Sequence, residues 1–327
     1  MPKVACRRRW QLFAAVALLL ITCPMRAQSQ GDVHLLQGIA VGGARCLSVS
    51  PDGQYLVVGT SVGTALIFET ESWQAVATLT GHTSEIRAVA FDRTGRIVAT
   101  GSEDSLVKLW EVPLGRFVRT IAALRSVRDL SFSPTSSSLA VGSTAGVEVF
   151  DASSGAYLTK ISDARGSTIV FSPNGSLLAG ELRGRSGIGL WDIVSWGRVG
   201  RLREGREISD IAFSPDGQFI ASCEYDDSWV SVHNVSTQTL VINIDAGHTS
   251  SLAYSPDGRL LATGSRTFPS SRPTPIKVWR SEEGRTELLA LLEGHVYSVL
   301  AIAFDPAGEW LASCSSDNTL RVWRVPG

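Results

Sequence analysis

Residues 211–217 read Ile-Ala-Phe-Ser-Pro-Asp-Gly, and this pattern recurs along the 327-residue chain. It joins an apolar stretch to a tight turn, because proline presets the first turn torsion and glycine tolerates a positive φ. Aligned on the apolar residue before the turn, the chain shows seven units, with anchors at Val49, Phe91, Phe132, Phe171, Phe213, Tyr254 and Phe304. Successive anchors are 42, 41, 39, 42, 41 and 50 residues apart, so the chain is built from an internal repeat.

Short β-favouring segments flank each turn, such as residues 86–91 before it and 96–100 after it in the second unit. A third segment of each unit ends at an aromatic residue or a histidine: Phe68, Trp110, Phe150, Trp191, His233, Trp279 and Trp323. Four strands per unit at a period of about 40 to 45 residues are typical of a β-propeller blade. The sequence therefore predicts an all-β, seven-bladed β-propeller with four-stranded antiparallel blades.

The seven units leave no length for a second domain. Seven units of roughly 43 residues account for about 300 residues, which is the length that remains when residues 1–27 are set aside. The last unit stops just after its third segment at Trp323, so its outer strand is missing. Residues 32–38 are expected to supply that strand, which closes the ring with strands from both ends of the chain and removes exposed edges.

Residues 1–27 have the pattern of a secretory leader, because a basic head precedes an apolar run over residues 12–22 that is too short to span a bilayer. We therefore expect a signal peptide at 1–27 and a single propeller domain at 28–327, secreted or periplasmic, with no membrane insertion after the leader is removed. An alternative is that residues 20–23, Leu-Ile-Thr-Cys, form a bacterial lipoprotein box with Cys23 as the lipidated residue. Threonine before the cysteine departs from that pattern.

The charge balance changes once the leader is set aside. The whole chain has 30 basic and 31 acidic residues, and removal of the five basic residues of the leader leaves 25 against 31, a net charge of −6. An acidic protein is poorly suited to bind nucleic acid or anionic lipid surfaces. The five histidines show no metal-ligand spacing, and no phosphate-binding glycine loop opens a helix, so we expect no metal and no cofactor.

Two units carry a further motif. Unit two has Gly81-His82, then Asp104 and Trp110, and unit seven has Gly294-His295, then Asp317 and Trp323. In these motifs and in its period the chain resembles the WD-repeat family of seven-bladed propellers, and we expect a secreted, bacterial member of that family. The resemblance implies a buried structural network, since a single active site would not recur. Its members would be His82, Thr100, Ser102, Asp104, Trp110, His295, Ser313, Asp317 and Trp323.

The resemblance also implies a docking surface on the face that carries the turns between the second and third strands. The expected contact residues come from units two to four and from an insertion in unit six: Arg87, Arg128, Arg165, Arg183, Arg185, Phe268 and Arg272. The four arginines from Arg128 to Arg185 could form a basic patch. We therefore predict a non-catalytic, monomeric scaffold that binds protein partners outside the cytoplasm. The alternative is an extracytoplasmic propeller enzyme or small-ligand-binding protein that uses the mouth of the central channel, although no catalytic set stands at diagnostic spacing.

Overall fold

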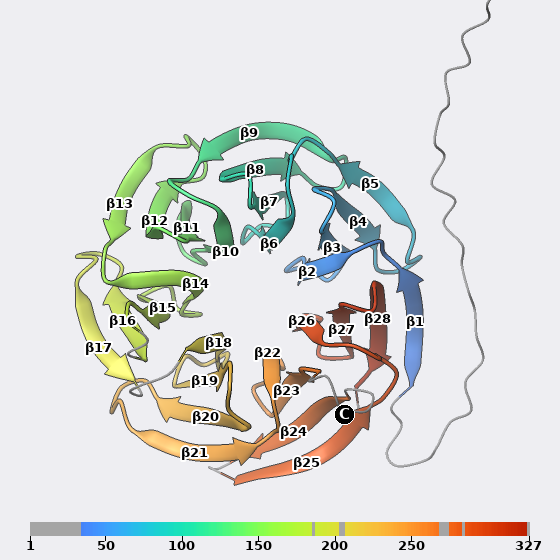
Figure 1. The fold of residues 1–327 in the computed structure, drawn as a ribbon, viewed down its shortest axis with the longest axis vertical. Helices are drawn as coiled ribbons and strands as arrows, with labels where there is room; N and C mark the ends of the chain where they lie inside the picture. The colour runs from blue at the N-terminus through green and yellow to red at the C-terminus, as the bar shows by residue number, and fades with distance from the viewer. Residues whose placement is uncertain (1–33, 185–186, 203–206, 268–274, 283–284, 326–327) are drawn as a thin grey trace, which may run out of the picture.

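Seven four-stranded sheets are arranged in a ring (Figure 1). The computed structural model describes residues 34–184, 187–202, 207–267, 275–282 and 285–325. All strand pairs within the sheets are antiparallel, so the predicted seven-bladed propeller of four-stranded blades is confirmed. Within these described ranges, no helix is both long enough and apolar enough to cross a bilayer.

The strands follow the chain blade by blade. Blades 1 to 3 contain β2 (Ala44–Val49), β3 (Tyr55–Thr60), β4 (Ala65–Glu69), β5 (Ala75–Leu79), β6 (Ile86–Phe91), β7 (Ile97–Ser102), β8 (Leu106–Glu111), β9 (Arg116–Ala122), β10 (Val127–Phe132), β11 (Ser138–Ser143), β12 (Gly146–Asp151) and β13 (Tyr157–Ile161). Blades 4 to 6 contain β14 (Ala164–Phe171), β15 (Leu177–Leu182), β16 (Ile188–Asp192), β17 (Arg198–Leu202), β18 (Ile208–Phe213), β19 (Phe219–Glu224), β20 (Trp229–Asn234), β21 (Leu240–Asp245), β22 (Thr249–Tyr254), β23 (Leu260–Ser265), β24 (Ile276–Glu282) and β25 (Arg285–Leu292). Blade 7 contains β26 (Val299–Phe304), β27 (Trp310–Ser315), β28 (Thr319–Arg324) and, from the other end of the chain, β1 (Leu35–Ala40).

The ring is closed as the sequence predicted, by a strand from the N-terminal side. β1 pairs antiparallel with β28, with Leu35 opposite Trp323 and Ala40 opposite Thr319 (Figure 1). The strand lies two to three residues further along the chain than the predicted range of 32–38. The predicted signal peptide and Cys23 lie outside the described residues.

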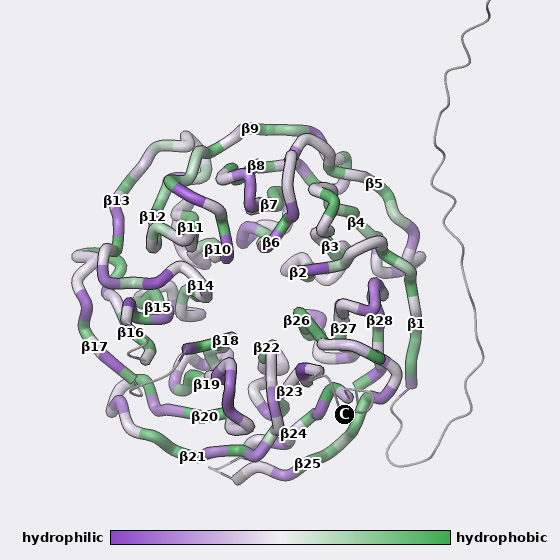
Figure 2. The backbone as a smooth tube through the Cα atoms, viewed as in Figure 1, coloured by the Kyte–Doolittle hydropathy of each residue, from purple (hydrophilic) through white to green (hydrophobic). Residues whose placement is uncertain are grey.

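The core lies between the blades. Seven clusters of buried apolar side chains each join two neighbouring blades, as where Ile67 of blade 1 packs with Phe91 of blade 2. The second strand of every blade is the most buried, whereas the outer strands keep most side chains exposed, several of them apolar (Figure 2). Each blade therefore depends on its neighbours for its apolar contacts, as expected for a repeat fold.

The turns sort onto two faces. The Ser-Pro-Asp-Gly turns between first and second strands lie at one end of the ring, which we call the bottom face, together with the turns between third and fourth strands. Gly217 adopts φ 69° there, and its N–H donates to the carbonyl of Ser214 at 2.8 Å. The other end, the top face, carries the loops that lead into each blade and the turns between second and third strands.

Candidate functional site

Blade 2 holds the first of the two motifs found in the sequence. His82, in the loop before β6, has its Nδ1 2.9 Å from Asp104 Oδ2 and its Nε2 2.9 Å from Thr100 Oγ1. The indole of Trp110 donates to the same hydroxyl at 2.9 Å. Ser102 does not contact the histidine, because its hydroxyl donates to a backbone carbonyl of the loop at 3.0 Å. Four side chains from two strands, a turn and a loop are thus tied into one buried unit.

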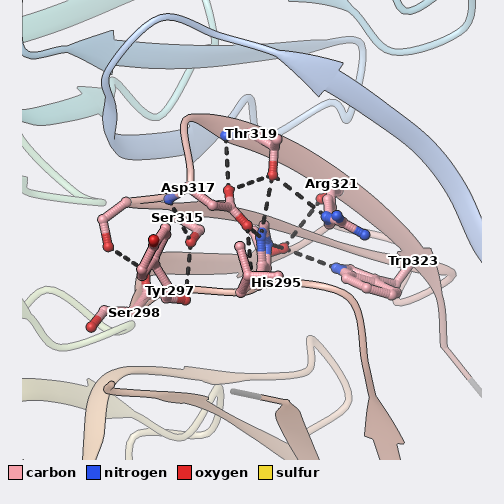
Figure 3. Close-up of polar contacts among 11 residues, drawn as sticks. His295, Tyr297, Ser298, Ser315, Asp317, Thr319, Arg321 and Trp323 are labelled. Atoms are coloured by element: carbon pink, nitrogen blue, oxygen red, sulfur yellow. Dashed lines mark hydrogen bonds and ion pairs between the residues drawn. The ribbon is translucent and has the colours of Figure 1, made fainter. Parts of the chain in front are cut away.

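Blade 7 repeats this arrangement (Figure 3). His295 Nδ1 is 2.8 Å from Asp317 Oδ2, and its Nε2 is 2.8 Å from Ser313 Oγ, which also accepts the indole N–H of Trp323 at 2.9 Å. Burial lowers the pKa of His295, so the ring is neutral, donates through Nδ1 and accepts the serine proton at Nε2. Burial alone would raise the pKa of Asp317, but hydrogen bonds from His295 and Thr319 hold it well below its usual range.

Ser313, His295 and Asp317 have the connectivity of a serine-hydrolase triad, but their surroundings do not allow that chemistry. Ser313 is 0% exposed, and its oxygen already accepts the Trp323 indole proton. A catalytic serine must meet a substrate carbonyl that can approach both the hydroxyl and a pair of oxyanion donors. No substrate atom can reach a hydroxyl enclosed in this way, so the network serves the structure of the blade.

Blades 1 and 3 show what happens when the hydroxyl is absent. The position that holds Thr100 in blade 2 is Val58 in blade 1 and Val141 in blade 3, both fully buried. In these blades the third strand ends in Phe68 and Phe150 rather than in tryptophan. Phenylalanine has no N–H to satisfy, so an apolar valine is a suitable neighbour.

Blades 4 and 6 keep the tryptophan and supply an acceptor in different ways. Trp279 of blade 6 donates to Thr263 at 3.1 Å, as in blade 2. Blade 4 has glycine at the hydroxyl position, and Trp191 donates instead to Asp163 of the preceding loop at 3.0 Å. In blades 2, 4, 6 and 7, every indole N–H at this position thus has an acceptor, as buried polar groups require.

The top face carries a chain of ion pairs that links three blades. Arg45 of blade 1 lies 2.5 Å from Glu85 in the loop before blade 2, and Glu85 pairs with Arg87 at 3.2 Å. Arg87 and Arg128 both contact one oxygen of Glu103, at 2.9 and 3.2 Å. The side chains of Arg87, Glu103 and Arg128 remain 29–38% exposed. We call these five residues the ion-pair row, a fixed line of alternating charge that faces solvent.

A second group links blades 4 and 5. Arg165 pairs with the fully buried Glu181 at 3.1 Å and with Glu207 at 3.0 Å, and Ser167 donates to the other oxygen of Glu181. A buried carboxylate needs such partners, because removing an isolated charge from water is costly. The basic patch suggested by the sequence is therefore not formed by Arg128 and Arg165, since carboxylates neutralise both guanidinium groups.

The other predicted contact residues fall in different places. Arg183 lies on the top face, where its Nε donates to the carbonyl of Ala164 at 3.2 Å and its Nη2 donates to the carbonyl of Ala145 in blade 3. It thus ties two blades together. Arg185, Phe268 and Arg272 lie outside the described residues.

Two half-buried aspartates on the innermost strands were not identified from the sequence. Asp129 on β10 accepts the backbone N–H of Ile169 on β14 at 2.7 Å, and Asp210 on β18 accepts that of Leu252 on β22 at 2.8 Å. Burial raises the pKa of each carboxyl to about 7, and the charge of Asp210 contributes to the shift of Asp129. The signal was an aspartate three residues before the anchor, inside an otherwise largely apolar strand, in units three and five.

The remaining reactive groups give no reaction centre. Among the described residues, no group of three or more His, Cys, Asp or Glu side chains could hold a metal ion. Cys46, Cys223 and Cys314 are buried free thiols, and burial raises the pKa of each. A protonated, enclosed thiol is a poor nucleophile.

The ring of seven four-stranded sheets, with its repeated His-hydroxyl-Trp network, defines a seven-bladed β-propeller of interacting repeats. Four segments match the family model "WD domain, G-beta repeat", at residues 73–111, 198–234, 238–267 and 286–324. The chain is thus a seven-bladed β-propeller in which four segments match the WD40 repeat. WD40 propellers typically bind protein partners as scaffolds and are generally non-catalytic.

Curated proteins with similar sequences include "Nuclear distribution protein PAC1" of Arthroderma benhamiae, 29% identical over 286 residues, which cover 75% of this chain and 60% of that protein. "Pre-mRNA-processing factor 19 homolog 2" of Arabidopsis thaliana is 26% identical over 287 residues, 83% of this chain and 52% of that protein. "Serine-threonine kinase receptor-associated protein" of Gallus gallus is 22% identical, with 85% and 77% covered. The chain thus spans 60% or less of the length of the first two. These relatives are eukaryotic and do not support the expectation of a secreted, bacterial member.

A solved structure shows the same architecture. The crystal structure of the Myceliophteria thermophila Cps50 (Swd1) beta-propeller domain superimposes with a TM-score of 0.78 at 17% sequence identity. The match covers 90% of this chain and 100% of that one. At this identity the likeness concerns the fold alone.

Proposed function

We propose that the chain is a non-catalytic, monomeric platform that binds a protein partner through the top face of the propeller. The observation that carries this proposal is the ion-pair row, whose charged groups come from three blades and hold one another in place. Exposed ion pairs contribute little to stability, so a row that spans three blades is better explained by recognition than by folding. Side chains already fixed by their neighbours also lose little freedom on binding.

The charge pattern indicates the chemistry of the partner. Arginines and glutamates alternate along the row, and Glu207, which pairs with Arg165, adds a further partly exposed carboxylate. A partner surface that carries both acidic and basic side chains fits this pattern better than a purely acidic one. Complementary charges of this kind mainly set the association rate and the choice of partner.

A charge swap tests the proposal. The triple variant Arg87→Glu/Glu103→Arg/Arg128→Glu inverts the signs at three positions of the row and keeps opposite charges side by side among them, while Glu85 comes to lie beside a second carboxylate at position 87. Protein partners that co-purify with the wild-type chain from its native source are expected to be lost. Arg259→Glu, at a 72% exposed bottom-face position, is the matched control and should retain them. If the triple variant melts like the wild type and keeps the same partners, the top face is not the docking surface.

We further propose that the protein acts outside the cytoplasm, in a bacterial source, with residues 1–27 as the signal peptide. Support comes from the basic head and apolar run of that segment. Fractionation of a bacterial host should find a shortened chain outside the cytoplasm, whereas a variant without residues 2–27 should stay inside. Recovery of the full-length chain from the cytoplasm would contradict the leader assignment. Loss of membrane association in Cys23→Ala would instead favour lipidation.

A further inference from the structure

A cavity of about 290 Å³ opens on the bottom face between blades 2 and 3. Its walls are apolar and come from Ile97, Leu109 and Val118 of blade 2 and Phe132 of blade 3. Its rim is polar and includes Ser137 and Ser153 from two turns of blade 3. The cavity thus combines an apolar interior with hydroxyl groups at its mouth, which is the usual composition of a binding site for a small group.

The exposure of Phe132 marks the cavity as a departure from the repeat. The phenylalanines at the same position in blades 2, 4, 5 and 7 are only 5–8% exposed. Phe132 is half-buried and lines the cavity. Blade 3 therefore leaves apolar surface open that most other blades cover.

Equivalent junctions in this chain show how such a surface can be covered. The turn between third and fourth strands holds a residue with positive φ, which is a tryptophan in two blades, Trp73 in blade 1 (φ 55°) and Trp196 in blade 4 (φ 53°), but Gly115 in blade 2 and Gln238 in blade 5. Trp73 packs edge to face on Trp310 of blade 7, with ring centroids 5.3 Å apart, and Trp196 packs on the core cluster between blades 3 and 4. Tyr55 packs into the junction between blades 1 and 2. Three junctions are thus filled by aromatic rings.

Blade 3 has Gly155 at this turn position. Its φ is 78°, and its N–H donates to the carbonyl of Asp151 at 2.7 Å, as those of Trp73 and Trp196 donate to the carbonyls four residues before them. The backbone is therefore the same, and only the ring is missing. On the facing wall, Ile97 stands six residues after its anchor, where blade 7 has Trp310. Neither wall supplies the aromatic ring.

We infer that this cavity is a docking site for a tryptophan side chain of a partner protein. A cavity of about 150 Å³ accommodates benzene, so the volume found here suits an indole and is small for a drug-sized ligand. The chemistry at the mouth also fits. The hydroxyls of Ser137 and Ser153 both donate to Asp151, which leaves their oxygen lone pairs free to accept an indole N–H. The same pairing of indole and hydroxyl occurs inside blades 2 and 7.

This site lies on the face opposite the ion-pair row. The inference therefore goes beyond the proposed function, and the experiments that test the two are independent. The probe is N-acetyl-tryptophanamide, titrated into protein with labelled methyl groups. Chemical-shift changes are expected at Ile97, Leu109 and Val118. N-acetyl-leucinamide should bind roughly tenfold more weakly, because it lacks the ring.

Two substitutions of Gly155 distinguish the effect of filling the cavity from the effect of backbone strain. Gly155→Trp should place a ring in the cavity, as Trp73 places one in its own junction, and abolish the shifts; the atoms nearest the new Cβ belong to the side chains of Arg119, at 3.2 Å, and Ile121, at 4.0 Å. Gly155→Ala carries the same positive-φ strain without a ring and should retain binding. If Gly155→Trp does not fold, Ile97→Trp fills the cavity from the other wall and should have the same effect.

A random peptide library then tests the link to a partner protein. Peptides selected on the wild-type chain and depleted on the Gly155→Trp variant are expected to contain tryptophan. The inference is overturned if the methyl groups do not respond to the tryptophan amide, if the leucine amide binds equally well, or if both filling variants still bind. Enrichment of peptides without aromatic residues would also overturn it.

Discussion

Replacement of Thr100 with valine isolates the hydroxyl at the centre of the blade 2 network. The substitution preserves shape, and valine already occupies this position in blades 1 and 3. In blade 2, however, it removes the acceptor of the Trp110 indole N–H and the partner of His82 Nε2, both at 2.9 Å and in a fully buried site. A stranded buried polar group costs about 1 to 3 kcal/mol. With two groups affected, we expect the free energy of unfolding to fall by about 2 to 4 kcal/mol.

A second substitution tests whether that cost comes from the stranded indole. In the double variant Thr100→Val/Trp110→Phe both partners are apolar, as in blades 1 and 3, and replacing both partners costs much less than removing one. The two substitutions should therefore be coupled by about 1 to 2 kcal/mol in a double-mutant cycle. Guanidinium denaturation followed by circular dichroism measures each free energy. A cost below about 0.5 kcal/mol for Thr100→Val, or strict additivity in the double variant, would refute the reasoning.

Arg165→Ala should lower the free energy of unfolding by about 3 to 5 kcal/mol in chemical denaturation, because it leaves the buried carboxylate of Glu181 without its cation; no measurable loss would mean that the pair is not formed. Asp129 and Asp210 have pKa values of about 7 in the folded state, against an ordinary value of 3.8, so the folded state binds these two protons more tightly than the unfolded state does. The protonated carboxyls therefore stabilise the fold fully below about pH 4, and this stabilisation is lost as the pH rises through 7. The double variant Asp129→Asn/Asp210→Asn should flatten this fall in thermal melts between about pH 5 and about pH 8, and an unchanged slope would contradict it. Removal of residues 1–41 should cause unfolding or aggregation, because it takes β1 away from the edge of β28. Removal of residues 1–33 keeps β1 and should leave the melting temperature unchanged. Size-exclusion chromatography and thermal melting of both deletion variants test this difference.

The parts of this structure that the sequence predicted depend on local chemistry that repeats. The turn after each anchor, which is Ser-Pro-Asp-Gly in units one, five and six and a variant of it elsewhere, joins the first two strands in every unit, so seven anchors were enough to place seven blades. The networks of His82 and His295 were expected from the resemblance to the WD-repeat family, and the recurrence of their members favoured a structural role over a catalytic one. Ring closure followed from the count of strands, and only the register of β1 was displaced.

Contacts between blades could not be predicted in this way. Arg128 meets Glu103 of the preceding blade, 25 residues away, and Arg165 meets Glu207 of the following blade. The repeat indicates that these side chains share the top face, but which carboxylate each one meets depends on how neighbouring blades sit against each other. For this reason Arg128 and Arg165, two of the four arginines expected in a basic patch, are paired with carboxylates. The inter-blade hydrogen bond of Asp129 escaped prediction for the same reason.

In a repeat fold, each blade can be compared with the other blades of the same chain, and the cavity between blades 2 and 3 was recognised in this way. Gly155 read alone is an ordinary turn glycine, and only comparison with Trp73 and Trp196, which share its backbone conformation, reveals a missing ring. The same comparison separates the structural networks, whose polar members are replaced together by valine and phenylalanine in blades 1 and 3, from surface features that occur once. A feature needed to build a blade must recur or be replaced by an equivalent. Neither the ion-pair row nor the open cavity is needed to build a blade, which is why function is better sought at these two places than at the buried histidines.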